Sequence, residues 1–426
     1  MPSNKALQMK NVEAELQKLE AKFEEYKSMG LNLNMTRGKP CSEQLDLSAE
    51  LNTCLAADDY LAEDGTDCRN YGGLDGIPEA RRLFAELLEV PAENIMAAGN
   101  SSLNLMYDNV LRALLFALPG SDKSWSAQGQ VKFICPSPGY DRHFFVTQSL
   151  GIEMIPVAMT AEGPDMDEVE KMVAADPMIK GMWSVPVYSN PDGIIYSEAV
   201  CRRLASMKTA AADFRIFLDN AYNVHYLFPE HENKIPEMIS LCAEYGNENR
   251  IFEFASTSKI TFAGGGMACI AASTDNLNWI RKHMSAQTIG PDKLNQLRHV
   301  RFLKNAEGVN QLMAKHADIL RPKFVLVLDL LEKNLADCPE CHWTRPEGGY
   351  FISVFVSKGT ASEVVRLANE CGVALTPAGN TYPYGKDPDN SNIRLAPSFP
   401  PLDELKLAIE VFCDCVMLAT LRKLKQ

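Results

Sequence analysis

Hydrophobic and polar residues alternate with helical spacing near the start of the chain. Apolar side chains recur every three or four positions between residues 4 and 29, at Met9, Val12, Leu16, Leu19, Phe23 and Tyr26. This spacing predicts an amphipathic helix, and Gly30 is a natural stop because glycine readily adopts the conformation that ends helices. Residues 31–47 break the pattern and predict a flexible segment before the body of the chain.

Between residues 58 and about 300, helical patterns alternate with short apolar segments rich in β-forming residues. The helical patterns cover 79–89, 102–118 and 197–209, and the strand-like segments cover 94–97, 132–135, 182–187, 214–218 and 251–254. Such alternation predicts a mostly parallel sheet covered by helices on both faces. In open sheets of this type, ligands bind outside the carboxyl ends of the strands.

The remaining sequence predicts a smaller α+β domain. A helical pattern runs over 305–335, where Pro322 either kinks one long helix or divides two. Strands at 350–356 and 392–395 and helices at 361–371 and 402–424 follow. We predict an α/β protein with a helix and arm at 1–57 that join the small domain, a large domain at 58–304 and a small domain at 305–426. The lack of a linker predicts an extensive interface between the domains.

Composition narrows the class of protein. The chain of 426 residues is 46% hydrophobic, enough to bury a large core, and its net charge of −13 without a long basic run argues against a nucleic-acid surface. No stretch is long and apolar enough for a membrane, and the start lacks the apolar centre of a signal peptide, so we expect a cytoplasmic protein. The twelve cysteines, such as Cys201, Cys242, Cys269, Cys371 and Cys413, are then expected to be reduced.

One cysteine cluster tests that interpretation. Cys338-Pro339-Glu340-Cys341-His342 matches a c-type haem attachment pattern, and its two cysteines would also suit zinc. A haem protein needs an export signal and zinc needs a second pair of ligands, and we find neither. We therefore predict a turn before a strand, and no metal.

Polar motifs follow three successive predicted strands. They are Asn190-Pro191-Asp192-Gly193, Asp219-Asn220-Ala221-Tyr222 and Ser256-Thr257-Ser258-Lys259. Each has an ordinary alternative: Asn190 fits a turn, Asp219 a helix cap, Tyr222 a core position and Lys259 a solvated loop. Together they match every polar atom of pyridoxal phosphate, with a carboxylate for the ring nitrogen, an amide and a phenol for the phenolic oxygen, an amine for the aldehyde and a hydroxyl for the phosphate.

In this order, with Arg37-Gly38-Lys39-Pro40 and Ile393-Arg394-Leu395-Ala396-Pro397 at either end, the motifs resemble those of fold-type I, class I aminotransferases. The similarity is to the aspartate aminotransferase subgroup related to the aminotransferase domains of MocR-type regulators, and it covers nearly the whole chain. It implies the pyridoxal-phosphate-dependent transferase fold of type I, with a large domain built on a mostly parallel sheet and a smaller α+β domain.

The resemblance implies a role for each residue near the cofactor ring. Lys259 would form the Schiff base with the cofactor and then move the proton at the substrate α-carbon. Asp219 would pair with the pyridinium nitrogen, and Asn190 and Tyr222 would hydrogen-bond the phenolic oxygen and lower the pKa of the Schiff base. Tyr140 would lie flat against the ring.

The phosphate would lie where backbone amides at the start of a helix favour an anion, at Gly99, Asn100 and Ser101, with the hydroxyl of Ser256 nearby. Ser101 could equally be a plain helix cap. Tyr71 would reach the phosphate of a neighbouring subunit, which implies a homodimer with shared active sites. Most class I members place an arginine on the phosphate shortly after the lysine, but this chain has Gly264-Gly265-Gly266-Met267. We hypothesise that Ser258 and the amides of the glycine run compensate.

The resemblance also implies residues that bind the substrate. Arg394 would clamp the α-carboxylate, and Gly38 would lie at the substrate face. Arg37 and Lys293 are candidates to bind a distal carboxylate, although either could be a surface charge. We predict transfer of the amino group from L-aspartate to 2-oxoglutarate, giving oxaloacetate and L-glutamate. The alternatives are an aminotransferase for aromatic amino acids, alanine or 2-aminoadipate, a β-lyase or decarboxylase on the same scaffold, and a non-catalytic sensor that binds the cofactor.

Overall fold

An eight-stranded sheet forms the centre of the large domain, in the order β2-β9-β8-β7-β6-β3-β4-β5. The computed structural model describes residues 4–228 and 234–425, with side chains described from Val12 onward. The strands are β2 (Ile95–Ala97), β3 (Lys132–Ser137), β4 (Glu153–Thr160), β5 (Gly163–Pro164), β6 (Ile179–Ser184), β7 (Arg215–Asp219), β8 (Ile251–Ser256) and β9 (Ala268–Ala272). The run from β4 through β3, β6 and β7 to β8 is parallel, and β9 is antiparallel to both of its neighbours.

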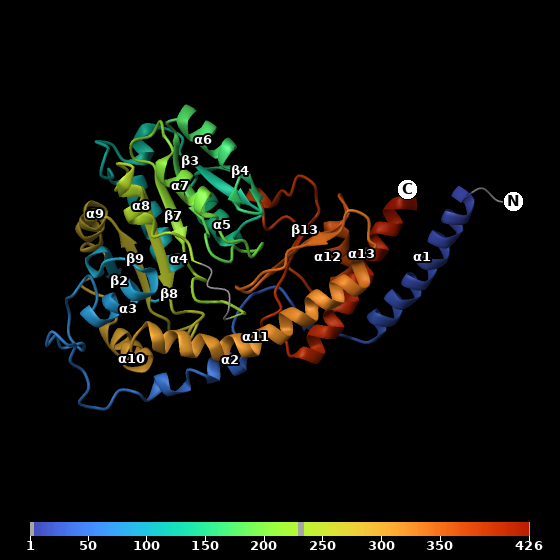
Figure 1. The fold of residues 1–426 in the computed structure, drawn as a ribbon, viewed down its shortest axis with the longest axis horizontal. Helices are drawn as coiled ribbons and strands as arrows, with labels where there is room; N and C mark the ends of the chain where they lie inside the picture. The colour runs from blue at the N-terminus through green and yellow to red at the C-terminus, as the bar shows by residue number, and fades with distance from the viewer. Residues whose placement is uncertain (1–3, 229–233, 426) are drawn as a thin grey trace.

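Helices cover both faces of this sheet (Figure 1). They are α3 (Pro78–Leu88), α4 (Ser102–Leu115), α5 (Asp141–Ser149), α6 (Met166–Ala175), α7 (Glu198–Ser206), α8 (Met238–Glu244), α9 (Thr274–Met284) and α10 (Lys293–Leu303). Along β7, Ile216 and Leu218 join an apolar cluster with α3, α7 and α8, whereas Phe217 joins a second cluster with α4, α5 and α9. Because successive strand residues face opposite sides, β7 buries apolar side chains under both helix layers.

The smaller domain contains a three-stranded antiparallel sheet of β10 (His342–Trp343), β11 (Ile352–Phe355) and β13 (Asn392–Leu395). It packs with α12 (Ala361–Glu370), α13 (Leu402–Lys425) and α11 (Ala306–Leu335). The helix α11 is continuous over 30 residues with Pro322 inside it, so the proline does not divide two helices. In Figure 1 this helix runs from beside the large sheet into the smaller domain.

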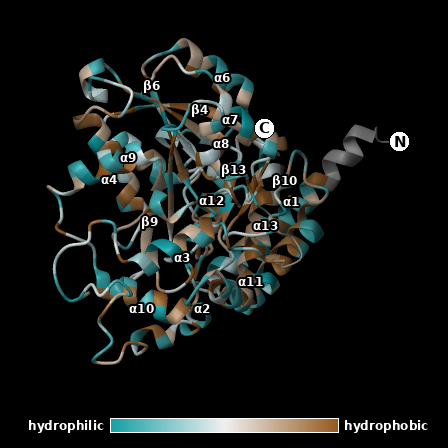
Figure 2. Ribbon diagram, turned by 60° about the vertical axis from the view of Figure 1, so that its left-hand side comes forward, coloured by the Kyte–Doolittle hydropathy of each residue, from teal (hydrophilic) through white to brown (hydrophobic). Residues whose placement is uncertain are grey.

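The predicted first helix is α1 (Asn4–Ser28), and it packs against α13. Leu16, Leu19, Phe23 and Tyr26 are buried there, whereas the side chain of Met9 lies outside the described residues. The segment expected to be flexible contains β1 (Leu33–Asn34), which pairs with β12 (Val373–Ala374), and α2 (Ser42–Asp46). Figure 2 shows the helices banded in teal and brown, as expected for elements with one exposed and one buried face.

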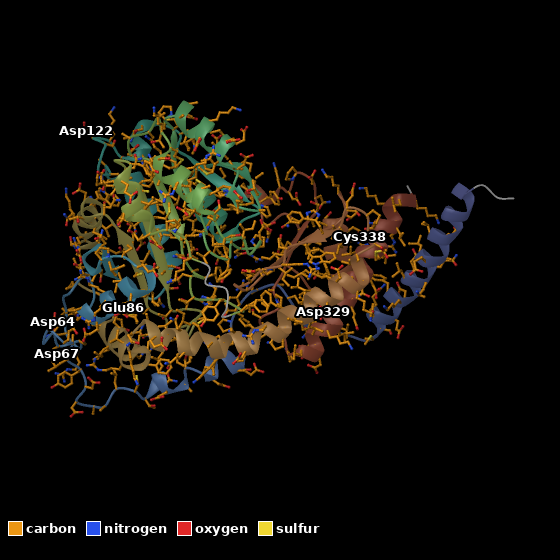
Figure 3. The ribbon with its side chains drawn as sticks, viewed as in Figure 1. Asp64, Asp67, Glu86, Asp122, Asp329 and Cys338 are labelled. Atoms are coloured by element: carbon orange, nitrogen blue, oxygen red, sulfur yellow. A yellow bond between two sulfur atoms is a disulfide. The ribbon has the colours of Figure 1, made fainter. Side chains whose placement is uncertain are left out.

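The expectation that all twelve cysteines are reduced is wrong for one pair. Cys338 and Cys341 form a disulfide in the turn between α11 and β10, where their Cα atoms are 5.4 Å apart and within bonding range (Figure 3 labels Cys338). The predicted turn before a strand is confirmed, and the other ten cysteines are free. Within residues 4–228 and 234–425, no His, Cys, Asp or Glu cluster suits a metal ion, and no helix has the length and apolarity to cross a bilayer.

Candidate active site

A cavity of about 740 Å³ is lined by residues that follow the carboxyl ends of β6, β7 and β8. It brings together seven of the predicted site residues, namely Arg37, Gly38, Tyr140, Asn190, Tyr222, Lys259 and Arg394. These come from the arm, the large domain and the smaller domain. The three strands are adjacent and parallel, so motifs that are far apart in sequence meet at one edge of the sheet.

Lys259 lies in the turn that follows β8. Its Nζ is 4.6 Å from the centre of the Tyr222 ring. Burial raises the pKa of Tyr222, and the nearby charge of Asp219 raises it further, so the phenol keeps its proton as a hydrogen-bond donor. Burial also raises the pKa of Tyr140 to about 12, an effect that the positive charge of Lys259 opposes. The amine therefore lies near two phenols that keep their protons.

Asp219 ends β7 and is buried, with only one of its oxygens hydrogen-bonded. Its Oδ2 lies 3.0 Å from Nε2 of His143, whose ring stacks on Trp183 with 4.5 Å between the ring centres. Oδ1 is buried and has no partner among the described residues. A buried carboxylate oxygen needs a donor, and the protonated ring nitrogen of pyridoxal phosphate would supply one. His143 was not among the residues predicted for the site, although its place three residues after Tyr140 could have indicated it.

The residues expected to hold a phosphate lie together at the start of α4. The hydroxyl of Ser256 donates to Oγ of Ser258 at 3.2 Å, and that of Ser258 donates to the carbonyl of Asn100 at 3.5 Å. Gly99 has a left-handed φ of 67°, and its carbonyl accepts from the amide of Ala268. Ser101 precedes α4 without a side-chain capping bond, so the amides of the first helical turn and its hydroxyl are available to an anion.

Arg394 lies on β13 and is buried between the domains. Its Nη1 donates to Oδ1 of Asp141 at 3.0 Å and to Oδ1 of Asn190 at 3.2 Å, and Nη2 lies 3.4 Å from Oγ1 of Thr376. Its Nε is buried without a partner among the described residues. The guanidinium is thus held in one orientation while keeping an unsatisfied donor, as a carboxylate-binding group requires. The contribution of Asp141 was not predicted from the sequence.

Gly38 is packed against Phe351, a neighbour of the Arg394 guanidinium. A Cβ atom at residue 38 would lie 2.5 Å from Cζ of Phe351, so any larger residue requires the Phe351 ring to shift. The Phe351 ring centre is 4.8 Å from Cζ of Arg394. Arg37 is exposed at the cavity, and its side chain has no partner among the described residues.

Lys293 does not line the cavity of its own chain. Its Nζ is hydrogen-bonded to the carbonyls of Asn70 at 2.8 Å and Gly72 at 2.6 Å. The lysine instead holds the loop that carries Tyr71, whose side chain is 83% exposed. In this chain the ammonium is bonded to backbone oxygens, and its expected role toward a distal carboxylate stays a prediction.

Known proteins are similar to this chain in sequence and in fold. The sequence profile of the aspartate amino-transferase family matches residues 7–426. The chain is 50% identical over 401 residues to the aspartate aminotransferase of Corynebacterium glutamicum, covering 94% of this chain and 92% of that protein. A crystal structure of an aspartate transaminase from C. glutamicum superposes with a TM-score of 0.95 at 48% identity, covering 97% of both chains.

A more distant structure shares the fold. LysN, the α-aminoadipate aminotransferase of Thermus thermophilus, was solved with N-(5'-phosphopyridoxyl)-L-leucine and has a TM-score of 0.74 at 21% identity, covering 92% of this chain and 93% of that one. The family match spans almost the whole chain, and Tyr140, Asn190, Tyr222 and Lys259, four of the residues expected to bind the cofactor, line one cavity. This chain therefore belongs to the aspartate aminotransferase family, as a pyridoxal-phosphate-dependent aminotransferase of fold type I.

Proposed function

We propose that this protein is an aspartate aminotransferase that transfers the amino group of L-aspartate to 2-oxoglutarate, giving oxaloacetate and L-glutamate. The observation that carries this proposal is the charge of the cavity. Its lining includes the cationic side chains of Arg37, Lys39, Arg142, Lys259 and Arg394, and Asp141 is the only carboxylate among the described lining residues. In a chain with a net charge of −13, such a site favours anionic ligands, as dicarboxylic acids are.

The residues present fit pyridoxal phosphate. When bound, this cofactor supplies a conjugated ring that stabilises the electron pair left at the substrate α-carbon. The unpartnered oxygen of Asp219 would hold the proton on the ring nitrogen, and Asn190 and Tyr222 would hydrogen-bond the phenolic oxygen. Ser101, Ser256 and the amides beside Gly99 would hold the phosphate, and we retain the hypothesis that Ser258 and the glycine run 264–266 replace the missing arginine.

Two side chains would then control the reaction. Lys259 would accept and return the proton of the substrate α-carbon. Arg394, held by Asp141 and Asn190, would orient the α-carboxylate so that the Cα–H bond stands perpendicular to the cofactor plane, which selects proton transfer over loss of carbon dioxide.

Two further features belong to the proposal. The exposed Tyr71, held in place through Lys293, would complete the phosphate site of a second subunit in a homodimer. The contacts of α1 with α13 and of β1 with β12 support assigning residues 1–57 to the smaller domain, with the large domain at 58–304 and the rest of the smaller domain at 305–426.

The test is a spectral titration of the holoenzyme. L-Aspartate should convert the absorbance of the cofactor linked to Lys259 into that of the aminated cofactor, and 2-oxoglutarate should restore it. L-Alanine and L-phenylalanine serve as comparisons and should respond far more weakly. A spectrum that ignores aspartate but responds to phenylalanine or alanine would refute the proposed substrate. A spectrum without any lysine-linked cofactor band would refute the role of Lys259.

A further inference from the structure

Arg142 lies on the wall of the active-site cavity and has no bonding partner in the described part of the chain. It is the second residue of α5 and is half-buried. Other cations of the cavity are engaged: Arg394 is bonded to Asp141, and Lys39 lies 4.0 Å from the centre of the Phe399 ring. A partly buried guanidinium without an anion is unfavourable unless a ligand supplies one.

The first turn of α5 presents two successive side chains to one cavity. Asp141 contacts Arg394, and Arg142 follows it directly. Successive residues of an α-helix project about 100° apart, so Arg142 reaches a part of the cavity away from the Asp141–Arg394 contact. Besides the exposed Arg37, the cavity therefore offers two guanidinium groups, of Arg142 and Arg394, which suits a ligand with a carboxylate at each end.

The backbone beside Arg142 is fixed more firmly than that beside Arg37, the other candidate to bind a distal carboxylate. His143, the next residue, is buried between Asp219 and Trp183, at 3.0 Å from the Asp219 carboxylate. Arg37, by contrast, is exposed and lies in an irregular segment between β1 and α2. A side chain on a pinned helix loses less conformational freedom on binding and places its charge more accurately.

We propose that Arg142 binds the distal carboxylate of the substrate and so sets the preference for dicarboxylic over monocarboxylic amino acids. This inference rests on the proposed function of the site. The guanidinium would donate two parallel N–H bonds to the carboxylate, a geometry that a lysine cannot reproduce. Arg394 would hold the other end of the same molecule.

The test compares Arg142→Gln with the wild-type holoenzyme. The value of kcat/KM for L-aspartate should fall about 100-fold, and that for L-alanine by no more than about threefold, because only aspartate carries the distal charge. Calorimetric titration with maleate, a dicarboxylate that does not react, should show a similar loss of affinity, while propionate binding stays unchanged. Arg142→Lys should give an intermediate loss, and Arg202→Gln, an exposed arginine on α7 outside the cavity, should give none.

The maleate titration needs no turnover, so it separates this inference from the proposed function. A wild-type enzyme that binds maleate through Arg142 but does not transaminate aspartate would refute the proposed function and support the inference. The inference is overturned if Arg142→Gln keeps the aspartate-to-alanine ratio and the maleate affinity, or if Arg37→Gln loses them instead. If the Arg142→Gln protein does not fold, Arg142→Lys is tested in its place. Unchanged maleate binding in Arg142→Lys would equally overturn the inference.

Discussion

The guanidinium of Arg394 is bonded to a carboxylate of its own chain, with Nη1 at 3.0 Å from Oδ1 of Asp141. The two residues come from different domains and are 253 positions apart in sequence. A substrate carboxylate that approaches Arg394 therefore meets a guanidinium whose positive charge is already partly neutralised by Asp141. Asp141 would hold the arginine in its binding orientation while weakening its attraction for substrate.

Replacing Asp141 with asparagine should strengthen substrate binding. The amide keeps a hydrogen-bond acceptor for Arg394 but removes the competing negative charge, and because Asp141 is partly exposed the gain is modest. We expect the dissociation constant of maleate to fall about threefold to tenfold, measured by calorimetry on the holoenzyme. Asp318→Asn, an exposed aspartate on α11, is the control. If Asp141→Asn instead binds maleate more weakly than wild type, the main effect of the Asp141 carboxylate is to position Arg394.

Asp219→Asn should abolish most of the activity without destroying the fold. An amide cannot hold a proton on the cofactor ring nitrogen as a carboxylate does, so the rate of the half-reaction with aspartate should fall about 100- to 10,000-fold. Stopped-flow absorbance measures this rate, and the cofactor content shows whether binding survives. His143→Gln should cause a smaller fall, because it removes only the support of Asp219. Equal losses in the two variants would contradict this division of roles.

Subunits with complementary defects should restore one active site. Lys259→Ala removes the amine from one chain, and Tyr71→Ala removes the phenol that the other site would borrow. Random mixing of the two refolded variants makes half of the dimers mixed, each with one intact site, so about a quarter of the wild-type activity should return. If Tyr71 acts within its own subunit, the mixture will show only the mean activity of the two separate variants.

Gly38→Ala should damage the site through Phe351. The added Cβ would lie 2.5 Å from the ring, which must move away from Arg394. Overpacking of this kind should destabilise the protein by about 1–3 kcal/mol in chemical denaturation and raise KM for aspartate. The double variant with Phe351→Leu should recover part of both losses. Strict additivity of the two substitutions would show that the clash is relieved elsewhere.

Glu253 should make stability depend on pH. It lies buried on β8, with its Oε1 accepting from Nδ2 of Asn220 at 2.9 Å, and burial raises its pKa from 4.5 to about 7. Between these values the folded protein binds more protons than the unfolded chain, so this group makes unfolding easier as pH rises from 4.5 to 7. Glu253→Gln cannot ionise, so its free energy of unfolding relative to wild type should rise by about 3 kcal/mol between pH 4.5 and pH 8.

Thermal and denaturant unfolding at pH 5 and pH 8 measure this difference. The exposed Glu404→Gln is the control, and its stability relative to wild type should not change with pH through this mechanism. If the difference in unfolding free energy between Glu253→Gln and wild type is the same at pH 5 and pH 8, Glu253 does not titrate between these pH values in the folded protein.

The sheet could be predicted from sequence because buried parallel strands read as apolar runs between helical patterns. Lys132 and Ile251 begin strands where the pattern placed them, but the strand expected at 182–187 lies at Ile179–Ser184. The reason is that Val185 and Val187 are buried in the loop that leads to Asn190, outside the strand. Apolar residues mark burial, and burial continues past the end of a strand.

The cofactor site was predictable where a residue type matched a single cofactor atom. Lys259, Tyr222 and Asn190 could be proposed together for that reason, whereas Arg394 was expected from the family resemblance, and all four line one cavity. The contacts of Asp141 with Arg394 and of His143 with Asp219 join residues 253 and 76 positions apart, so they depend on tertiary packing, between the two domains for Asp141 and within the large domain for His143. The same holds for Lys293, whose bonds to Asn70 and Gly72 have no local signature.

The pairing of α1 with α13 also determines when the protein can finish folding during synthesis. The hydroxyl of Tyr26 donates to Asp414, 388 residues later, and the apolar residues from Leu16 to Tyr26 are covered by α13, which is translated only after the intervening chain. While the ribosome makes the intervening chain, the central sheet can form but this early helix must wait with its apolar face uncovered. For that interval the nascent chain exposes an apolar helix face of the kind that chaperones recognise, and the finished enzyme buries it.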